Sequence, residues 1–141
     1  MPFTALIPVR FGDVDPAGFV YYANIYHYFH VAMEEYFAAR CGITYADLIE
    51  VERLGFPTVK VETEFFEPLH YGDVAQVEVK ITGVGDSSAT FEYQIKRSGE
   101  DVLCARSKQI QVCMSFETKR GVNVPDKYRA AFLLKDGTEG E

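Results

Sequence analysis

The hydrophobic period of this chain changes once, and that change constrains its fold more than any other feature. From about Tyr22 to Cys41 apolar residues recur at spacings of three and four, which is typical of a helix, and Gly42 is a suitable C-terminal stop. After Pro57 apolar residues alternate with polar ones, which is typical of β-strands. The sequence therefore predicts one long helix followed by a series of strands.

Turn-forming segments divide the alternating part of the chain into four strands. These turns are residues 67–73 (EPLHYGD), 83–88 (GVGDSS) and 98–101 (SGED). A further strand is expected at residues 4–11, and short helices at residues 47–53 and after Pro125. Because the long helix carries apolar residues on more than one face, it needs a surface to cover it, and a curved antiparallel sheet provides one. The expected fold class is α+β.

The length of 141 residues is sufficient for a single domain. We place that domain at residues 1–134 and expect the polar segment 135–141 to be a disordered tail. One helix covers only one face of the sheet and leaves its edges open. We therefore expect pairing through an edge into a homo-oligomer, either a dimer or a tetramer.

The last long strand has two unlike faces. One face carries Ile110, Val112, Met114 and Phe116, and the other carries Ala105, Ser107, Gln111 and Cys113. The second face is small or polar, so it is suited to close packing or to contact with a partner.

Composition excludes several classes of function. With 14 Lys and Arg against 21 Asp and Glu, the net charge of −7 is unsuited to binding nucleic-acid phosphates. Residues 1–10 do not resemble a signal peptide, and no window approaches the roughly 18 apolar residues of a membrane span. The three cysteines, Cys41, Cys104 and Cys113, are odd in number and show no CxxC or Cys/His metal spacing, which favours a reduced, cytoplasmic protein. Because His27 and His30 have no third ligand nearby, we expect no metal and no other cofactor.

Residues 11–29 (FGDVDPAGFVYYANIYHYF) carry the residue types that suggest chemistry. Asp13 and Asp15 lie between a strand and the start of the long helix, and Gly12 and Gly18 permit a positive φ or close approach of a ligand. A helix start offers free N–H groups and a partial positive charge. A carboxylate beside such an oxyanion donor forms two parts of an acyl-transfer site.

Other interpretations of the two aspartates are less consistent with the sequence. An EF-hand loop fails, because its fifth position is Ala17 and its twelfth is Asn24 instead of Glu. A phosphatase-type aspartyl nucleophile needs a doubly wound parallel sheet, which this strand order does not supply. The remaining alternative is that both aspartates are only turn residues and helix caps.

The same segment resembles the signature of the 4-hydroxybenzoyl-CoA thioesterase family of hotdog-fold acyl-CoA thioesterases. The resemblance rests on DVDPAGFVYYAN at residues 13–24, EEYF at residues 34–37 and FEPLHYGD at residues 66–73. It spans residues 4–125 and implies a hotdog fold, in which an antiparallel sheet wraps around one long central helix.

By this resemblance Asp15 is the catalytic carboxylate, and the backbone N–H of Tyr22 polarises the thioester carbonyl from the helix N-terminus. Gly18 lets the substrate approach the loop, and Asp13 is structural. Asp15 either attacks the thioester to form a mixed anhydride that water opens, or acts as a general base on water. The sequence leaves both routes open.

Further substrate-binding positions follow from the resemblance. Pro57 and Thr58 fall where the family places pocket residues of the neighbouring subunit, and Asn24 either caps the helix or faces the pocket. Ser87 and Ser88 either bind pantetheine or phosphate or belong to a plain turn, because this turn carries an acid where the family often has a base.

The function that the resemblance implies is hydrolysis of an acyl-CoA to the free acid and CoA. The 9 Tyr and 11 Phe favour an aromatic acyl group. The alternative is a non-catalytic module that binds acyl-CoA or acyl-carrier protein. A hotdog dehydratase would need a His with an acidic partner, and His27 and His30 do not occur in such a pattern.

Overall fold

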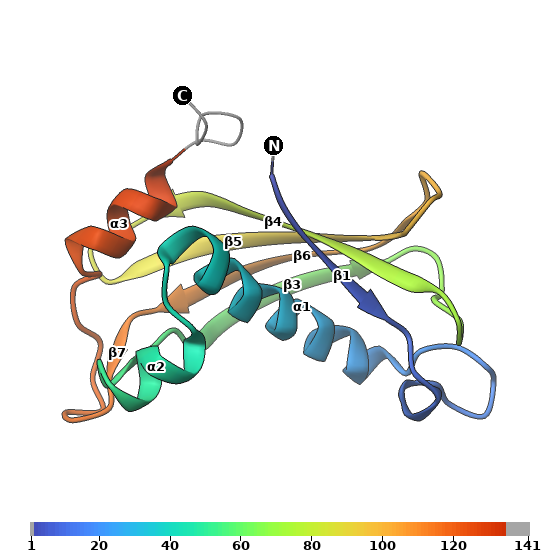
Figure 1. Ribbon diagram of the computed structural model, residues 1–141, viewed down its shortest axis with the longest axis horizontal. Coiled ribbons are helices and arrows are strands. Elements are labelled where there is room, and N and C mark those ends of the chain that lie inside the picture. The colour runs from blue at the N-terminus through green and yellow to red at the C-terminus, as the bar shows by residue number, and fades with distance from the viewer. Residues whose placement is uncertain (1, 135–141) are drawn as a thin grey trace.

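The computed structural model describes residues 2–134 (Figure 1). The tail expected at residues 135–141 lies outside the described residues. In chain order the strands are β1 (Phe3–Pro8), β2 (Leu54–Gly55), β3 (Thr58–Phe65), β4 (Val74–Val84), β5 (Ser88–Arg97), β6 (Leu103–Val112) and β7 (Met114–Ser115). The helices are α1 (Tyr22–Tyr36), α2 (Tyr45–Glu50) and α3 (Asp126–Leu133), with a 3-10 turn at Phe11–Asp13 and a π-helix at Phe37–Cys41.

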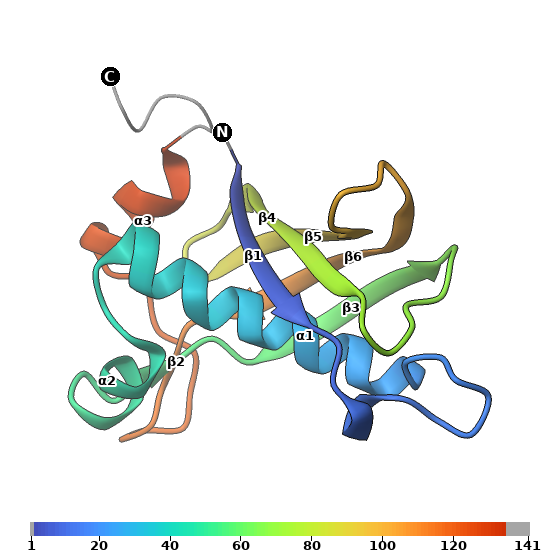
Figure 2. The same cartoon turned by 45° about the vertical axis from the view of Figure 1, so that its right-hand side comes forward.

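Five strands form one antiparallel sheet in the order β1-β4-β5-β6-β3. The sheet curves past α1, which packs along one of its faces (Figures 1 and 2). β2 and β7 form a separate two-stranded pair. The expected α+β fold, with one long central helix and an antiparallel sheet, is confirmed.

The central helix is buried on the side that faces the sheet. Tyr28 and Phe29 are 1% exposed, and Ala32 is fully buried. The helical segment ends at Cys41 as predicted, and Gly42 follows it with a φ of 70°, a left-handed conformation that favours glycine. The last five residues of the segment form a π-helix, a difference that hydrophobic spacing alone does not reveal.

Other element bounds shift from those expected. The helix expected at residues 47–53 begins earlier, because the Thr44 side chain caps it by accepting a hydrogen bond from the Asp47 N–H at 3.1 Å. The last long strand ends at Val112, and Met114–Ser115 pairs instead with β2. The helix expected after Pro125 is confirmed as α3.

β3 is an edge strand that runs between the two ends of the sheet. It begins at Thr58, which pairs with Gln111, and it ends at Phe65, which pairs with Ala105. The ring of Phe65 lies 6.4 Å from that of Tyr22 at the start of α1. The strand therefore connects the end of the sheet near the β4–β5 turn with the end near the loop between β1 and α1. Within residues 2–134 no helix is both long and apolar enough to cross a membrane.

Candidate active site

The loop before α1 folds back on itself around Asp15. The Asp15 N–H donates to the Phe19 carbonyl at 2.8 Å, and the Gly18 N–H donates to the Asp15 carbonyl at 2.9 Å. Gly18 closes this turn with a φ of 88°, which an L-residue rarely adopts. The backbone thus holds Asp15 in one position relative to the start of α1.

Asp13 fastens the same loop to the helix. Its carboxylate accepts a hydrogen bond from the Tyr28 hydroxyl at 2.7 Å and from the Arg10 N–H at 3.0 Å. Its carbonyl accepts from the Tyr21 N–H at 3.1 Å and from the Asn24 side-chain amide at 2.9 Å. These contacts agree with the structural role expected of Asp13. They also tie Asn24 to the loop, and its part in substrate binding stays a prediction.

The Asp15 side chain lies in a cavity of about 410 Å³ at this end of the sheet. Its Oδ1 accepts a hydrogen bond from the Ala17 N–H at 2.9 Å, which fixes the carboxylate without a cationic partner at that atom. The walls come from the start of α1 and from the β3–β4 connection, and include Tyr22, Ile25, Phe65, Phe66, Glu67 and Leu69. Sequence reasoning assigned no site role to the wall residues after Tyr22, because only the fold brings the β3–β4 turn beside α1.

The N-terminus of α1 reaches this same cavity. Its N-cap residue is Tyr21, whose side chain makes no capping hydrogen bond, and both Tyr21 and Tyr22 line the cavity. Uncapped first-turn N–H groups carry the positive end of the helix dipole. A carboxylate and the N-terminus of α1 therefore border one cavity.

A thiol also lines this cavity, but it is a poor nucleophile. Cys104 is 2% exposed, and burial raises the pKa of its thiol, so the reactive thiolate is disfavoured. Among residues 2–134 no group of three or more His, Cys, Asp or Glu side chains could hold a metal ion. Asp15 and Glu67 are the carboxylates among the residues that line this cavity, and Asp15 is the one on the loop that leads into α1.

The remaining sequence-predicted residues lie at the other end of the sheet. Pro57 and Thr58 stand at the start of β3, and Ser88 at the start of β5 pairs with Val112, one position along β6 from the partner of Thr58. Ser87 is beside them, its carbonyl accepting from the Cys113 N–H at 2.8 Å. β3 has eight residues, so at about 3.3 Å per residue its two ends are roughly 23 Å apart. Within one chain the structure does not bring these residues to Asp15.

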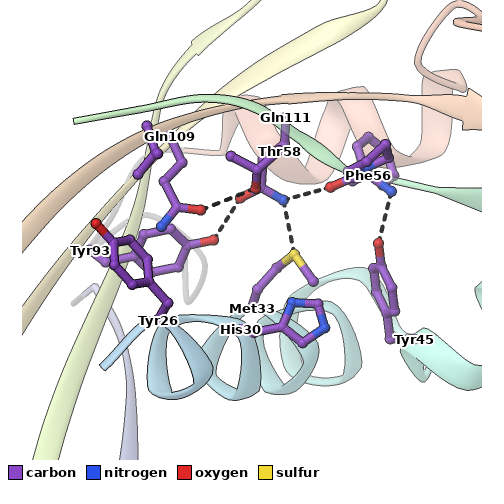
Figure 3. Close-up of a pocket in the computed structure, with 11 residues that line it drawn as sticks. Tyr26, His30, Met33, Tyr45, Phe56, Thr58, Tyr93, Gln109 and Gln111 are labelled. Atoms are coloured by element: carbon purple, nitrogen blue, oxygen red, sulfur yellow. Dashed lines mark hydrogen bonds between the residues drawn. The ribbon is translucent and has the colours of Figure 1, made fainter. Parts of the chain in front are cut away.

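A second cavity, of about 420 Å³, lies at that far end between α1 and the sheet. Thr58 and Gln109 approach it from the sheet, while Tyr26, His30 and Met33 approach it from α1 (Figure 3). Pro57 also lines it, and Ser87 and Ser88 are not among its lining residues. Sequence reasoning did not assign Tyr26, His30 or Gln109 to a binding site. The sequence feature that could have pointed to Gln109 is the small and polar face of the last long strand, on which this residue lies.

The sequence and the fold both match proteins of known function. The profile of the thioesterase-like superfamily matches residues 9–132. A 1,4-dihydroxy-2-naphthoyl-CoA hydrolase of Microcystis aeruginosa is 26% identical over 129 residues, which cover 92% of this chain and 90% of the relative. A crystal structure of a 1,4-dihydroxy-2-naphthoyl-CoA thioesterase from Synechocystis matches with a TM-score of 0.84 and 26% identity, over 94% of this chain and 96% of that one.

A structure of a gentisyl-coenzyme A thioesterase matches with a TM-score of 0.82 and 28% identity, over 92% of this chain and 99% of that one. These matches confirm the expected hotdog fold. They confirm the resemblance at the level of the superfamily, while the relatives named here carry names other than 4-hydroxybenzoyl-CoA thioesterase.

Proposed function

The chain belongs to the thioesterase-like superfamily, and from that premise we propose that it hydrolyses aromatic acyl-CoA thioesters, with Asp15 as its catalytic carboxylate. Because its relatives are named as CoA thioester hydrolases, the chain is a thioester hydrolase. The aromatic acyl group, the role of Asp15 and the oligomeric state are our proposals.

The observation that carries the proposal is that Asp15 and the uncapped N-terminus of α1 share one cavity. Hydrolysis breaks the bond between the carbonyl carbon and sulfur, and negative charge develops on the carbonyl oxygen. First-turn N–H groups stabilise that charge, a contribution of about 3–4 kcal/mol per donor in related chemistry. Asp15 supplies the second requirement, an oxygen that attacks the carbonyl or activates water.

Two routes use these same groups. In the first, an Asp15 oxygen bonds to the carbonyl carbon and CoA leaves as the thiolate. Water then opens the mixed anhydride, which releases the acid and regenerates the carboxylate. In the second, Asp15 takes a proton from water as its oxygen attacks the carbonyl carbon, and the proton passes to the departing thiolate. Both routes form one acid and one CoA for each water consumed.

Aromatic side chains support an aromatic acyl group. The ring of Phe65 lies 6.4 Å from that of Tyr22 and 6.3 Å from that of Tyr26, so aromatic rings gather where β3 ends beside α1. The relatives are named for naphthoyl and gentisyl thioesters, whose acyl groups are also aromatic. Flat rings pack favourably against such walls.

We further propose that two copies of the chain pair through β3. Val59, Val61 and Phe65 on this edge strand are 63%, 44% and 49% exposed. Antiparallel pairing of two identical strands about a two-fold axis brings the start of one beside the end of the other. Thr58 of one copy then lies near Asp15 of the partner subunit, and the two groups of predicted site residues meet.

The charges along β3 are compatible with this pairing. Pairing centred on Val61 places Lys60 opposite Glu62 of the partner subunit, whereas pairing centred on Glu62 would place the two Glu62 carboxylates opposite each other, so the charges favour the first register. Opposite charges across neighbouring strands are favourable, and like charges are not. The dimer is the minimal unit of the proposed homo-oligomer, because it completes the site.

A basic side chain accompanies the turn expected to bind CoA. Arg129 on α3 donates to the carbonyls of Gly85 and Asp86 at 2.9 and 3.0 Å, beside Ser87 and Ser88. This arginine supports a phosphate site at the turn despite its acidic residue.

The free cysteines of the described chain support a cytoplasmic location, where thiols stay reduced.

The direct test is thiol release from aromatic, short-chain and long-chain acyl-CoAs, with Asp15→Asn assayed in parallel. We expect hydrolysis of the aromatic thioesters and a loss of at least roughly a hundredfold in kcat for the variant. The matched control is Asp101→Asn, because the Asp101 side chain is 94% exposed and lies outside both cavities. Full activity of Asp15→Asn would overturn the site, and no turnover of any acyl-CoA would overturn the function.

A further inference from the structure

The inner face of the sheet is apolar on β4 and β5 but polar on β6. Val77 on β4 and Phe91 on β5, for example, are fully buried. On β6 the inner positions carry Ser107, Gln109 and Gln111, which are 1%, 7% and 1% exposed. In residues 2–134 no other Ser, Thr, Asn, Gln or charged side chain is as buried. Because polar groups are costly to bury, this row calls for hydrogen-bond partners.

Gln111 finds all of its partners within the protein. Its Oε1 accepts from the Tyr93 hydroxyl at 2.7 Å, and its amide nitrogen donates to the Phe56 carbonyl and the Met33 sulfur, each at 2.9 Å (Figure 3). Both amide protons of Gln111 are therefore used, and it has none left to donate to a ligand. Gln111 joins the sheet, α1 and the segment before β3 into a rigid floor.

Gln109 differs from Gln111 in its remaining capacity. Its Oε1 accepts from the Thr58 hydroxyl at 3.2 Å, and its amide nitrogen donates to the Ser107 hydroxyl at 3.1 Å. Ser107 in turn shares a hydrogen bond of 2.9 Å with Thr63. These contacts fix the orientation of the Gln109 amide. Within the described chain they use one of its two amide protons, so the second is available to a ligand.

The space in front of Gln109 suits an aromatic ring. The cavity of about 420 Å³ has Tyr26, His30 and Met33 on its α1 side (Figure 3). A dry cavity of about 150 Å³ already accommodates benzene, so this one has room for a substituted or bicyclic ring. The lining also includes the rings of Tyr45, Phe56 and Tyr93. Aromatic walls with a small number of polar groups, of which the Gln109 amide is one, are typical of a specific ligand pocket.

We propose that this cavity receives the acyl group and that Gln109, oriented by Thr58 and Ser107, selects aromatic acyl groups bearing a hydroxyl. The inference rests on the proposed function, because it assigns the substrate class of the same site. Pairing through β3 brings Asp15 of the partner subunit to the open end of this cavity. The thioester then lies at that aspartate while the ring extends toward Gln109. The Gln109 amide binds the ring by donating a hydrogen bond to its hydroxyl.

The test compares benzoyl-CoA with its ortho, meta and para monohydroxy derivatives as substrates of the full-length protein. The wild type should show a kcat/KM for at least one hydroxylated substrate roughly tenfold above that for benzoyl-CoA. In Gln109→Leu this ratio should fall to near one, mainly through slower hydrolysis of the hydroxylated substrate. Thr58→Val, at an exposed strand end, should lower the ratio less, because it only frees the amide to rotate.

The matched control is Gln94→Leu, which makes the same change on β5 opposite Arg106 and outside the cavity. It should keep the wild-type ratio, and thermal melting should show that each variant is folded. Should Gln109→Leu fail to fold, the Thr58→Val ratio decides. Equal rates on all four substrates in the wild type, or an unchanged ratio in the folded variants, would overturn the inference alone. No turnover by the wild type would overturn the proposed function, and this inference with it.

Discussion

The Tyr28 hydroxyl donates a hydrogen bond of 2.7 Å to the Asp13 carboxylate and thereby joins the middle of α1 to the loop that carries Asp15. Tyr28 is 1% exposed. Burial, together with the neighbouring Asp13 carboxylate, raises the pKa of Tyr28 well above its ordinary value. The phenol therefore stays protonated and remains a donor over the working pH range.

Tyr28→Phe removes that donor while preserving the ring. We expect a loss of about 1–2 kcal/mol in the free energy of unfolding, because the half-buried Asp13 carboxylate loses a partner. Activity should fall through kcat more than through KM, since the loop that orients Asp15 loosens. Urea unfolding and steady-state kinetics measure both effects. Tyr71→Phe, at an exposed tyrosine, should change neither, and a wild-type kcat in Tyr28→Phe would show that the contact does not position Asp15.

Much of this fold could be predicted from hydrophobic spacing, because burial on one face imposes a period. The three- and four-residue spacing from Tyr22 located the central helix, and alternation located β3 to β6. The π-helix was not predictable, since its wider turn depends on packing. Phe37 at its start is fully buried, with its ring 5.2 Å from that of Phe56, a contact between segments distant in sequence.

The candidate site could be proposed from the sequence only where its residues are close together in the chain. Asp15, Gly18 and Tyr22 lie within one loop and one helix start, so a local motif identifies them. Alternation separates the two faces of β6 but cannot tell which one faces inward, so the polar row around Gln109 was not recognised as part of a cavity. Thr58 lies at the opposite end of β3 from Asp15, and its proposed contribution needs a second copy, which no single sequence displays.

Gly18 and Gly42 form a matched pair for testing the loop. Both have a positive φ, of 88° and 70°, and neither would bring an added Cβ within 4 Å of another atom. Replacement by alanine should therefore cost each variant about 1–2 kcal/mol of stability through backbone strain alone. Only Gly18→Ala should also lower kcat, because only that strain lies beside Asp15. Equal kcat in two variants of equal stability would contradict a role for the loop conformation.

Glu52 should make the fold sensitive to acid. The hydrogen bond from Lys127 at 2.6 Å, followed by that from the Tyr128 hydroxyl, lowers the pKa of Glu52 below its ordinary value of 4.5. The resulting stability is present above that value and is lost as the pH falls through the lowered pKa. Glu52→Gln should thus be less stable than the wild type by about 1 kcal/mol at neutral pH.

The difference in the free energy of unfolding should shrink progressively as the pH falls below 4.5, as urea unfolding over a series of pH values can show. Glu50→Gln, at the exposed last residue of α2 and two positions before Glu52, is the control and should behave as the wild type throughout the pH series. A stability difference that persisted in acid would show that Glu52 acts through packing and not through its charge.

Val61 tests whether β3 is the dimer interface. It lies near the middle of this edge strand and is 44% exposed in the single chain. Val61→Asp places two carboxylates close to the proposed two-fold axis, so we expect a shift from dimer to monomer and a parallel loss of activity. Light scattering and thiol release measure the two. Val51→Asp, at a valine 73% exposed outside the sheet, should remain dimeric and active, and an active Val61→Asp monomer would refute the shared site.

A mixing experiment with two inactive variants tests whether each site combines residues of two subunits. Asp15→Asn lacks the carboxylate, and Thr58→Trp blocks the far cavity at an exposed strand end, so each protein alone should be inactive. In a mixed dimer one site carries both defects, whereas the other combines an intact Asp15 with an intact cavity. Random pairing makes half of the dimers mixed, so refolding the two variants together should restore about a quarter of the wild-type activity. If each site were built within one chain, every site in the mixed dimers would carry a defect, and no activity would return.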